Sequence, residues 1–118
     1  MSHSINNAIP EKDCPVRNAM DAIGGKWRIP IIWEISMANS IRYNELKRNI
    51  PGITNIMLTR SLRSLEEYHI VTRTEYHTIP PHVEYSLTEN CNDLLLALNL
   101  IHEWGKKMEF GHPIESLP

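Results

Sequence analysis

Two arginines, Arg60 and Arg63, lie three residues apart in a stretch whose apolar residues have helical spacing. A guanidinium group is a planar fork of N–H donors that matches the O6 and N7 atoms of guanine or the oxygens of a phosphate. At about 100° per residue, the face with both arginines also carries Ile56 and is flanked by Asn55 and Thr59. This face suits contact with nucleic acid, or it is the solvated side of an ordinary core helix. The stretch alone favours neither interpretation.

The spacing predicts a helix over residues 54–68 that presents these side chains. Thr54 is a good N-cap and follows Pro51-Gly52, a pair that disfavours helix. The opposite face is apolar at positions i, i+4 and i+7, formed by Leu58, Leu62 and Leu65. A shorter amphipathic helix is predicted over residues 44–49, with Asn44 as its cap, across the turn 50–53. Two helices joined by a tight turn, with arginines on the outer face, are typical of a DNA-binding helix-turn-helix.

The period of the sequence changes after this helix. Residues 70–77 and 83–87 are β-branched and roughly alternating, which predicts two strands. Between them lies a proline-containing tip that cannot continue a strand ladder, with Thr78, Pro80, Pro81 and His82 as its candidate contact residues. A β-hairpin directly after a helix-turn-helix is the wing of a winged-helix fold, whose tip commonly lies along the DNA backbone or minor groove. The hairpin therefore favours the DNA interpretation over a plain core helix.

Composition and charge are compatible with a DNA-binding protein but do not require one. The 118 residues are 42% hydrophobic and 22% charged, as in one soluble globular domain. No apolar run approaches the roughly 20 residues that span a membrane, and the N-terminus has no secretion signal, so we expect a cytoplasmic protein. The net charge is −2, yet residues 40–73 hold six basic and three acidic side chains, a local +3. A basic patch on an otherwise acidic protein is suited to contact with phosphates. A solvated helix surface gives the same charge imbalance.

Metal, cofactor and enzyme chemistry find no support in the sequence. The two cysteines have no CxxC spacing, and no pair of the six histidines has the i, i+4 spacing of a helical zinc site. No glycine-rich phosphate loop, Ser-His-Asp order or buried carboxylate pair is visible. We therefore expect no metal, no cofactor and no catalytic residues.

Two further helices flank the predicted helix-turn-helix on its N-terminal side. Residues 1–12 are expected to be a flexible arm, and a helix over 13–24 begins with Pro15 at the tolerated first position and ends at Gly24-Gly25. A second helix is expected over about 27–37, with Pro30 near its first turn. A short extended segment, 41–43, leads into the next helix.

The last helix, over residues 88–108, is capped by Thr88 in this prediction. It is apolar over more than one face, with Leu95, Leu98, Ile101 and Trp104 in its stripe. In a protein this small, a second copy of the chain is the simplest cover for such a helix, so we expect a homodimer. The alternative is that this helix packs back on its own domain. We expect residues 13–110 to form one domain that includes the dimerisation helices at 13–24 and 88–108, followed by a disordered tail over 111–118.

Six fragments, in order and without a gap over residues 14–105, resemble the signature of the HxlR-type winged helix-turn-helix regulators, which are related to the multiple-antibiotic-resistance regulators. They are Cys14-Pro15-Val16, Ile23-Gly24-Gly25-Lys26-Trp27, Arg42-Tyr43-Asn44-Glu45-Leu46, Ile50-Pro51-Gly52-Ile53, Leu62-Arg63-Ser64-Leu65-Glu66 and Pro80-Pro81-His82-Val83-Glu84-Tyr85-Ser86-Leu87-Thr88. The resemblance implies an α+β, mainly helical fold: a winged helix-turn-helix with an added N-terminal helix and a C-terminal dimerisation helix. In that family the first and last helices build the dimer, so the resemblance also assigns Val16 of the first helix to the interface.

The resemblance also implies a function. A dimeric transcription factor would insert the helix over 54–68 into the major groove of double-stranded DNA, at an inverted-repeat site. Base contacts are then assigned to Asn55, Ile56, Thr59, Arg60 and Arg63. Phosphate contacts, which position a protein without specifying sequence, are assigned to Arg42, Lys47, Arg48 and Thr54. Repression is the commoner behaviour in the family and is the expectation here.

Three residues depart from the family pattern. His82 stands where arginine is frequent, and a neutral histidine would weaken the contact of the wing with DNA at neutral pH. Ile56 stands where a polar residue is common, and it either contacts a thymine methyl group or forms a half-buried edge. Pro30 leaves the start of the second helix uncertain.

The cysteines are candidates for sensing. Some family members sense oxidants or electrophiles through a cysteine that matches Cys14, which here precedes a predicted helix and has Arg17 within one turn. Cys91, near the start of the last helix, is a second candidate. The alternative for either cysteine is a small buried residue with no sensory role. Two alternatives stay open: a small non-thiol effector held at the dimer interface, or a winged helix that binds protein instead of DNA.

Overall fold

The computed structural model describes residues 14–110. The chain divides into two compact units, the first ending at Thr88 and the second beginning at Glu89. The predicted arm over 1–12 and tail over 111–118 lie outside the described residues. The assignment of 13–110 to a single domain stays a prediction.

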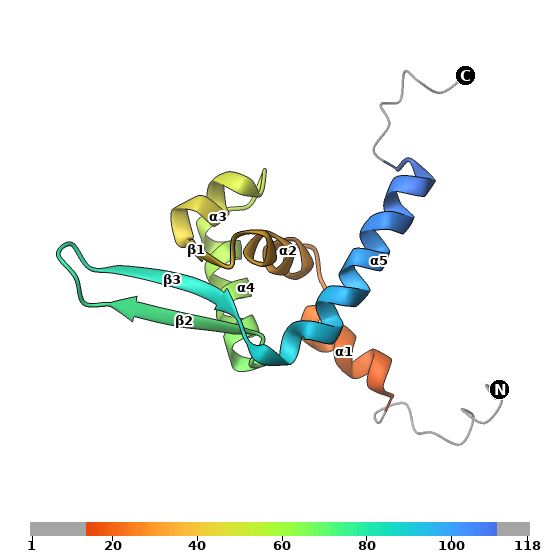
Figure 1. The fold of residues 1–118 in the computed structure, drawn as a ribbon, viewed down its shortest axis with the longest axis horizontal. Helices are drawn as coiled ribbons and strands as arrows, with labels where there is room; N and C mark the ends of the chain where they lie inside the picture. Colours follow the sequence, from red (N-terminus) through yellow and green to blue (C-terminus); the bar gives the residue numbers. More distant parts are fainter. Residues whose placement is uncertain (1–13, 111–118) are drawn as a thin grey trace. The chain divides into compact units, whose positions relative to one another are not determined.

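The first unit alternates helices with short strands (Figure 1). Its elements are α1 (Pro15–Ile23), α2 (Arg28–Ala38), β1 (Ser40–Arg42), α3 (Tyr43–Asn49), α4 (Asn55–Glu67), β2 (Val71–Tyr76) and β3 (His82–Leu87). The second unit consists of a 3-10 turn, η3 (Glu89–Cys91), and α5 (Asn92–Met108). This order of elements confirms the predicted winged-helix fold class.

The three strands form one antiparallel sheet with β3 in the middle. Ile41 of β1 pairs with Tyr85, and Arg73 of β2 pairs with the same residue from the other side. The β2–β3 hairpin extends away from helices α2, α3 and α4 (Figure 1), so its tip is free to reach a partner. The predicted wing is therefore present, with β1 as a third strand at its base.

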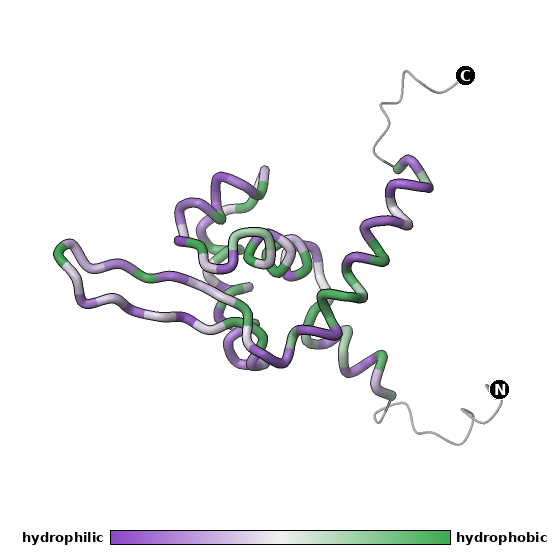
Figure 2. Tube along the Cα trace, in the orientation of Figure 1, coloured by the Kyte–Doolittle hydropathy of each residue, from purple (hydrophilic) through white to green (hydrophobic). Residues whose placement is uncertain are grey.

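The core of this unit lies between α2, α3, α4 and the sheet. Its fully buried side chains come from three helices and are Ile31, Ile32, Ile35, Leu46, Leu58, Leu62 and Leu65. The three leucines of α4 confirm the predicted buried stripe. Because one face of α4 is held by these contacts, the opposite face is fixed in its direction toward solvent. Figure 2 shows the same alternation of apolar and polar residues along the helices.

A tight turn separates α3 from α4. Gly52 has a positive φ of 86° there, a conformation that favours glycine. Thr54 then begins α4 as its N-cap, and its Oγ1 accepts a hydrogen bond from the backbone N–H of Met57 at 3.1 Å. The predicted cap is confirmed.

We expect Thr54→Ala to lower the free energy of unfolding by about 1 kcal/mol, because the N–H of Met57 then loses its acceptor. Urea unfolding followed by circular dichroism measures the change. Thr54→Ser keeps the hydroxyl and should stay close to the wild type. Equal loss in both variants would mean that the threonine methyl group, and not the cap, carries the effect.

Three predicted helix starts differ from the structure. α2 begins at Arg28, one residue later than expected, and α3 begins at Tyr43, so Asn44 lies inside the helix and is not its cap. Thr88 is not the cap of the last helix either. Its hydroxyl donates to the carbonyl of His69 at 2.7 Å, which ties the end of β3 to the end of α4. The chain then passes through η3 before α5 begins at Asn92.

The second unit carries a long helix with many exposed apolar side chains. Leu98 is 3% exposed, but Leu100, Ile101 and Trp104 are 73%, 53% and 55% exposed. Ile101, Trp104 and Met108 recur at helical spacing and so share one face of α5. Among the described residues, no helix is long and apolar enough to span a membrane.

Candidate nucleic-acid interface

The outward face of α4 carries the residues predicted to contact bases. Arg60 and Arg63 are both exposed, as are Asn55 and Thr59. Ile56 is 65% exposed, so it stands out from the surface and is not the half-buried edge that the sequence left open. The face therefore combines two guanidinium forks, two small polar groups and one apolar side chain.

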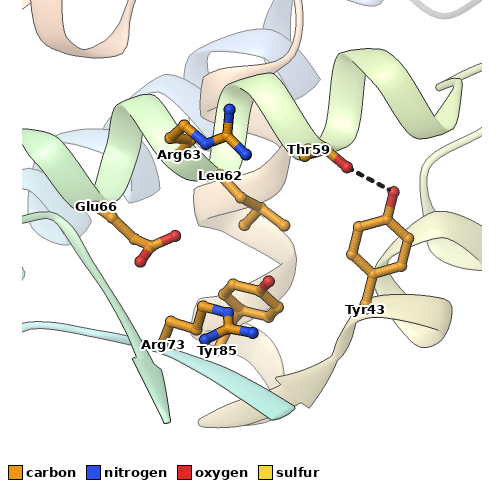
Figure 3. Close-up of a pocket in the computed structure, with 7 residues that line it drawn as sticks. All are labelled: Tyr43, Thr59, Leu62, Arg63, Glu66, Arg73 and Tyr85. Carbon is orange, nitrogen blue, oxygen red and sulfur yellow. Dashed lines mark hydrogen bonds between the residues drawn. The ribbon is translucent and has the colours of Figure 1, made fainter. Parts of the chain in front are cut away.

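Tyr43 is part of this face and was missed by the sequence analysis. Its hydroxyl lies 3.0 Å from Oγ1 of Thr59 (Figure 3). It also lies 3.1 Å from the backbone carbonyl oxygen of Asn55 and 3.3 Å from the Asn55 Oδ1. These contacts join α3 to the first turns of α4 and place the Tyr43 hydroxyl against two predicted base contacts. No local pattern could reveal this link, because Tyr43 is 12 and 16 residues from its partners.

The predicted phosphate contacts lie around this helix. Lys47 and Arg48 are in the last turn of α3, and Arg42 is the last residue of β1. Arg42 and Arg48 are exposed, and Lys47 is half-buried. Thr54 is exposed, but its hydroxyl is already engaged as the cap of α4. The phosphate assignments stay predictions.

The wing tip is ordered by local polar contacts. Thr78 Oγ1 donates to the carbonyl of Pro80 at 2.8 Å. The ring of His82 stacks on Tyr76 with 4.7 Å between centroids, and its Nε2 lies 2.9 Å from Glu84. Pro81, like Thr78 and Pro80, is exposed. His82 is thus half-buried against its own hairpin. Its side chain is therefore more restricted than that of an exposed arginine on the wing would be.

Glu84 joins the wing to the strand at its base. One of its carboxylate oxygens accepts a hydrogen bond from Ser40 Oγ of β1 at 2.5 Å, while the other lies near His82. The hydrogen bond from Ser40, followed by that from His82, lowers the pKa of Glu84 below its ordinary value of 4.5. The positive charge of Arg42 acts in the same direction.

This shift predicts the pH range in which Glu84 contributes to stability. Because its pKa is lowered in the folded state, the contribution is present above pH 4.5 and disappears as the pH falls through the folded-state value. Glu84→Gln should therefore lower the melting temperature at neutral pH, and its difference from the wild type should shrink below pH 4.5. Thermal melts at several pH values measure this.

Glu67→Gln, which removes an exposed carboxylate from the end of α4, is the control for loss of a negative charge. A gap between Glu84→Gln and the wild type that stays constant through acid would contradict the assignment.

The two cysteines lie in different surroundings. Cys14 is half-buried at the N-cap position of α1, and its carbonyl accepts from the N–H of Asn18. Cys91 is buried, with 3% of its surface exposed, and occupies the N-cap position of α5. Cys14 is therefore the more accessible of the two sensor candidates.

The predicted dimer contacts are divided by exposure. Val16 is 68% exposed on α1, and Ile101 and Trp104 are exposed on α5, whereas Leu98 is buried and Leu95 is half-buried. The dimer assignments stay predictions.

Within residues 14–110, no group of three or more His, Cys, Asp or Glu side chains is placed to hold a metal ion.

Comparison with known proteins relates this arrangement to a family of helix-turn-helix proteins. The family model described as HxlR-like helix-turn-helix matches residues 22–112. A putative regulatory protein MalR of Fusobacterium mortiferum is 40% identical over 80% of this chain and 89% of its own. The uncharacterised HTH-type transcriptional regulator YybR of Bacillus subtilis is 45% identical over 85% and 80%.

Solved structures show the same fold. The redox regulator HypR in its oxidised form is 44% identical, with a TM-score of 0.74 over 80% of this chain and 96% of that one. These relatives carry the names of regulators and not of enzymes. The exposed arginine face, the wing and the family match together show that this chain belongs to the HxlR-like helix-turn-helix family.

Proposed function

We propose that this protein is a transcriptional regulator that binds an inverted-repeat operator in double-stranded DNA as a homodimer and represses transcription. It would act in the cytoplasm, where the DNA is accessible. The observation that carries the proposal is the outward face of α4, which presents Arg60 and Arg63 beside a projecting hairpin. Two exposed guanidinium groups on this face match the acceptors of guanine edges and phosphates.

The roles of the residues follow from their positions. Arg60 and Arg63, with Asn55, Ile56 and Thr59, would contact base edges in the major groove. Arg42, Lys47, Arg48 and Thr54 would contact phosphates on either side, and the wing tip would follow the backbone. Tyr43 positions Asn55 and Thr59 and would therefore affect specificity without touching DNA itself.

We propose that the dimer forms through α1 and α5, because both present exposed apolar side chains in the protomer. Val16 and Met20 recur at i and i+4 on α1, and Ile101 and Trp104 at i and i+3 on α5. Monomeric soluble proteins rarely leave contiguous apolar faces exposed to solvent. A two-fold dimer would cover them and place two copies of α4 about one turn of DNA apart.

We further propose that Cys14 responds to thiol-reactive compounds. Support comes from its partial exposure at the start of a helix and from the likeness to HypR, a redox regulator solved in an oxidised form. Attack of the Cys14 thiolate on an electrophile would place an adduct at α1, next to the proposed dimer surface. Replacement of Cys14 by serine should abolish any effect of an electrophile on DNA binding.

The experiment that tests the function is a titration of the reduced protein against DNA from upstream of its own gene. A scrambled duplex of equal length and composition is the control, and the titration is repeated at several salt concentrations. We expect the upstream DNA to bind at least about 10³-fold more tightly than the scrambled DNA, with a steep salt dependence. Treatment with an electrophile should weaken binding by the wild type and not by Cys14→Ser.

The opposite outcomes are equally clear. No binding to any duplex at low salt would overturn the DNA-binding function and favour a protein partner. Equal loss of binding in the wild type and in Cys14→Ser would overturn sensing by this cysteine while leaving the regulator function intact.

A further inference from the structure

The tip of the β2–β3 hairpin ends in apolar side chains that stand in solvent. Among the described residues, no other large apolar side chain is as exposed as that of Ile79, at 100%. Pro80 and Pro81 follow it and are also exposed, so these three consecutive residues form an apolar tip. Ile79 was not among the wing residues predicted from the sequence. Single exposed apolar residues are common on protein surfaces, so the surroundings of this tip decide what it can do.

The hairpin lacks the groups that bind phosphates. Residues 74–88 contain no lysine or arginine, and they contain two glutamates. Arg73, at the base of the hairpin, is bonded to Glu75 at 2.6 Å. Proline has no backbone N–H, so Pro80 and Pro81 also remove two donors that a loop can offer to a phosphate. The chemistry of this wing therefore gives little support to a contact along the DNA backbone.

Polar contacts behind the apolar tip support it. Thr78 Oγ1 donates to the backbone carbonyl of Pro80 at 2.8 Å. The ring of His82 stacks on Tyr76, and its Nε2 lies 2.9 Å from Glu84. Each proline ring also fixes its own φ. A side chain on a rigid support loses less conformational freedom when it binds, so this tip is suited to insertion into a partner.

The base of the hairpin adjoins the proposed base-contact face of α4. Thr59 and Arg63 of α4 line the same pocket as Arg73 of β2 (Figure 3). Each strand of the hairpin has six residues, which corresponds to a length of about 20 Å. On B-DNA the neighbouring minor groove lies half a turn from the major groove, at about 17 Å. The hairpin is therefore long enough to reach a minor groove while α4 lies in the major groove.

We propose that the apolar tip enters the minor groove and acts as a wedge, with Ile79 placed between two adjacent base pairs that partly unstack. Isoleucine and proline are among the side chains that wedge DNA in this way. The gain is burial of the isoleucine side chain against the bases, and the cost is the stacking that is lost. This inference rests on the proposed function, and it gives the wing a contact with base pairs in place of a contact along the backbone.

The wedge makes the wing a source of sequence preference. Pyrimidine–purine steps unstack and kink more easily than other steps. We therefore expect such a step beside each half-site, in the minor groove that the tip reaches. The side chains of α4 would recognise bases in the major groove, and the wing would add a preference at base pairs outside that segment. The DNA should also bend toward the major groove at this step.

Ile79→Ala tests the wedge on the full chain, with the DNA from upstream of its own gene. We expect the variant to bind this DNA about tenfold more weakly than the wild type, because most of the inserted side chain is lost. The salt dependence of binding should stay unchanged, because no phosphate contact is removed. Ile79→Leu keeps the apolar bulk and should bind close to the wild type.

Met37→Ala is the matched control for the loss of an exposed apolar side chain. Met37 is 70% exposed near the end of α2 and belongs to no proposed DNA contact, so this variant should bind as the wild type does. Because both Met37 and Ile79 lie outside the core, the variants should keep the melting temperature of the wild type. An equal loss of binding in Met37→Ala would overturn the wedge.

Unstacking is measured directly with 2-aminopurine, an adenine analogue whose fluorescence rises when it leaves the base stack. The analogue replaces one adenine at a time in the upstream duplex. At saturating protein, the wild type should raise the fluorescence at one step beside each half-site, and Ile79→Ala should not. Replacement of that step by a purine–purine step should weaken binding by the wild type and leave binding by Ile79→Ala unchanged.

The contrary outcomes separate this inference from the proposed function. Specific binding of the upstream DNA that is equally tight in the wild type and in Ile79→Ala, or that raises the fluorescence at no position, would overturn the wedge alone. A lower salt dependence in Ile79→Ala would assign the tip to phosphates and also overturn the wedge. If the wild type binds no duplex, the proposed function is overturned, and the wedge with it.

Discussion

Replacement of both Arg60 and Arg63 by glutamine should abolish most of the preference for the operator. Each bidentate arginine–guanine contact contributes about 1–3 kcal/mol of discrimination, and contributions at separate base pairs add approximately. The double variant should therefore lose about 2–6 kcal/mol of specific binding. Because neither side chain belongs to the buried core, the variant should fold normally.

Fluorescence anisotropy with operator and scrambled duplexes at several salt concentrations measures this loss. Arg48→Gln is the matched control, because it removes one exposed arginine of α3 that is assigned to a phosphate. That variant should weaken both duplexes alike and reduce the salt slope by about 1. If the double variant also weakens both duplexes alike, Arg60 and Arg63 contact phosphates, and sequence is recognised elsewhere.

The arginine face could be predicted because its information is local. Leu58, Leu62 and Leu65 recur at helical spacing, so burial of one face fixes which residues stand opposite. The cap at Thr54 and the proline-containing tip of the hairpin could also be predicted, because each depends on a few neighbouring residues. Local patterns of this kind, together with the resemblance to a family, were sufficient for the fold class.

Contacts between distant segments could not be predicted in this way. Ser40 and Glu84 are 44 residues apart, and their bond depends on the pairing of β1 with β3. Threonine is a residue type that favours the N-cap position. The hydroxyl of Thr88 nevertheless donates to the backbone carbonyl of His69, because the fold places that carbonyl within reach. The tertiary contact with His69 outweighed the preference of threonine for capping, so the predicted cap at Thr88 was wrong.

A pocket between α4 and the sheet (Figure 3) is another feature that depends on contacts between distant segments. Its lining comes from α3, α4, β2 and β3, and none of these segments has a ligand-binding motif. Arg73 in particular looked like one alternating residue of a strand. Its pairing opposite Tyr85 of β3 places it in the same pocket as residues of α4.

Replacement of Ile101 by aspartate should convert the proposed dimer into monomers. Ile101 is 53% exposed on the apolar face of α5 that also carries Trp104 and Met108. Burial of an isoleucine side chain contributes about 1.5–3 kcal/mol, and burial of an unpaired carboxylate adds a further cost. The dissociation constant of the dimer should therefore rise by roughly 100-fold or more.

Sedimentation velocity over a wide range of protein concentration measures the change. Asn99→Asp is the matched control, because position 99 lies about 200° around the helix from 101 and receives the same negative charge. That variant should remain dimeric. Dimers that persist in Ile101→Asp would mean that this face of α5 does not form the interface.

Loss of the dimer should also weaken operator binding, although Ile101 belongs to no proposed DNA contact. Two linked copies of α4 bind as one unit, since the second contact occurs at a high effective concentration once the first has formed. A monomer must bind each half-site independently, so its affinity should fall while its preference among single half-site sequences is retained. That combination separates a defect in assembly from a defect in base recognition, which Arg60 and Arg63 would produce in the intact dimer.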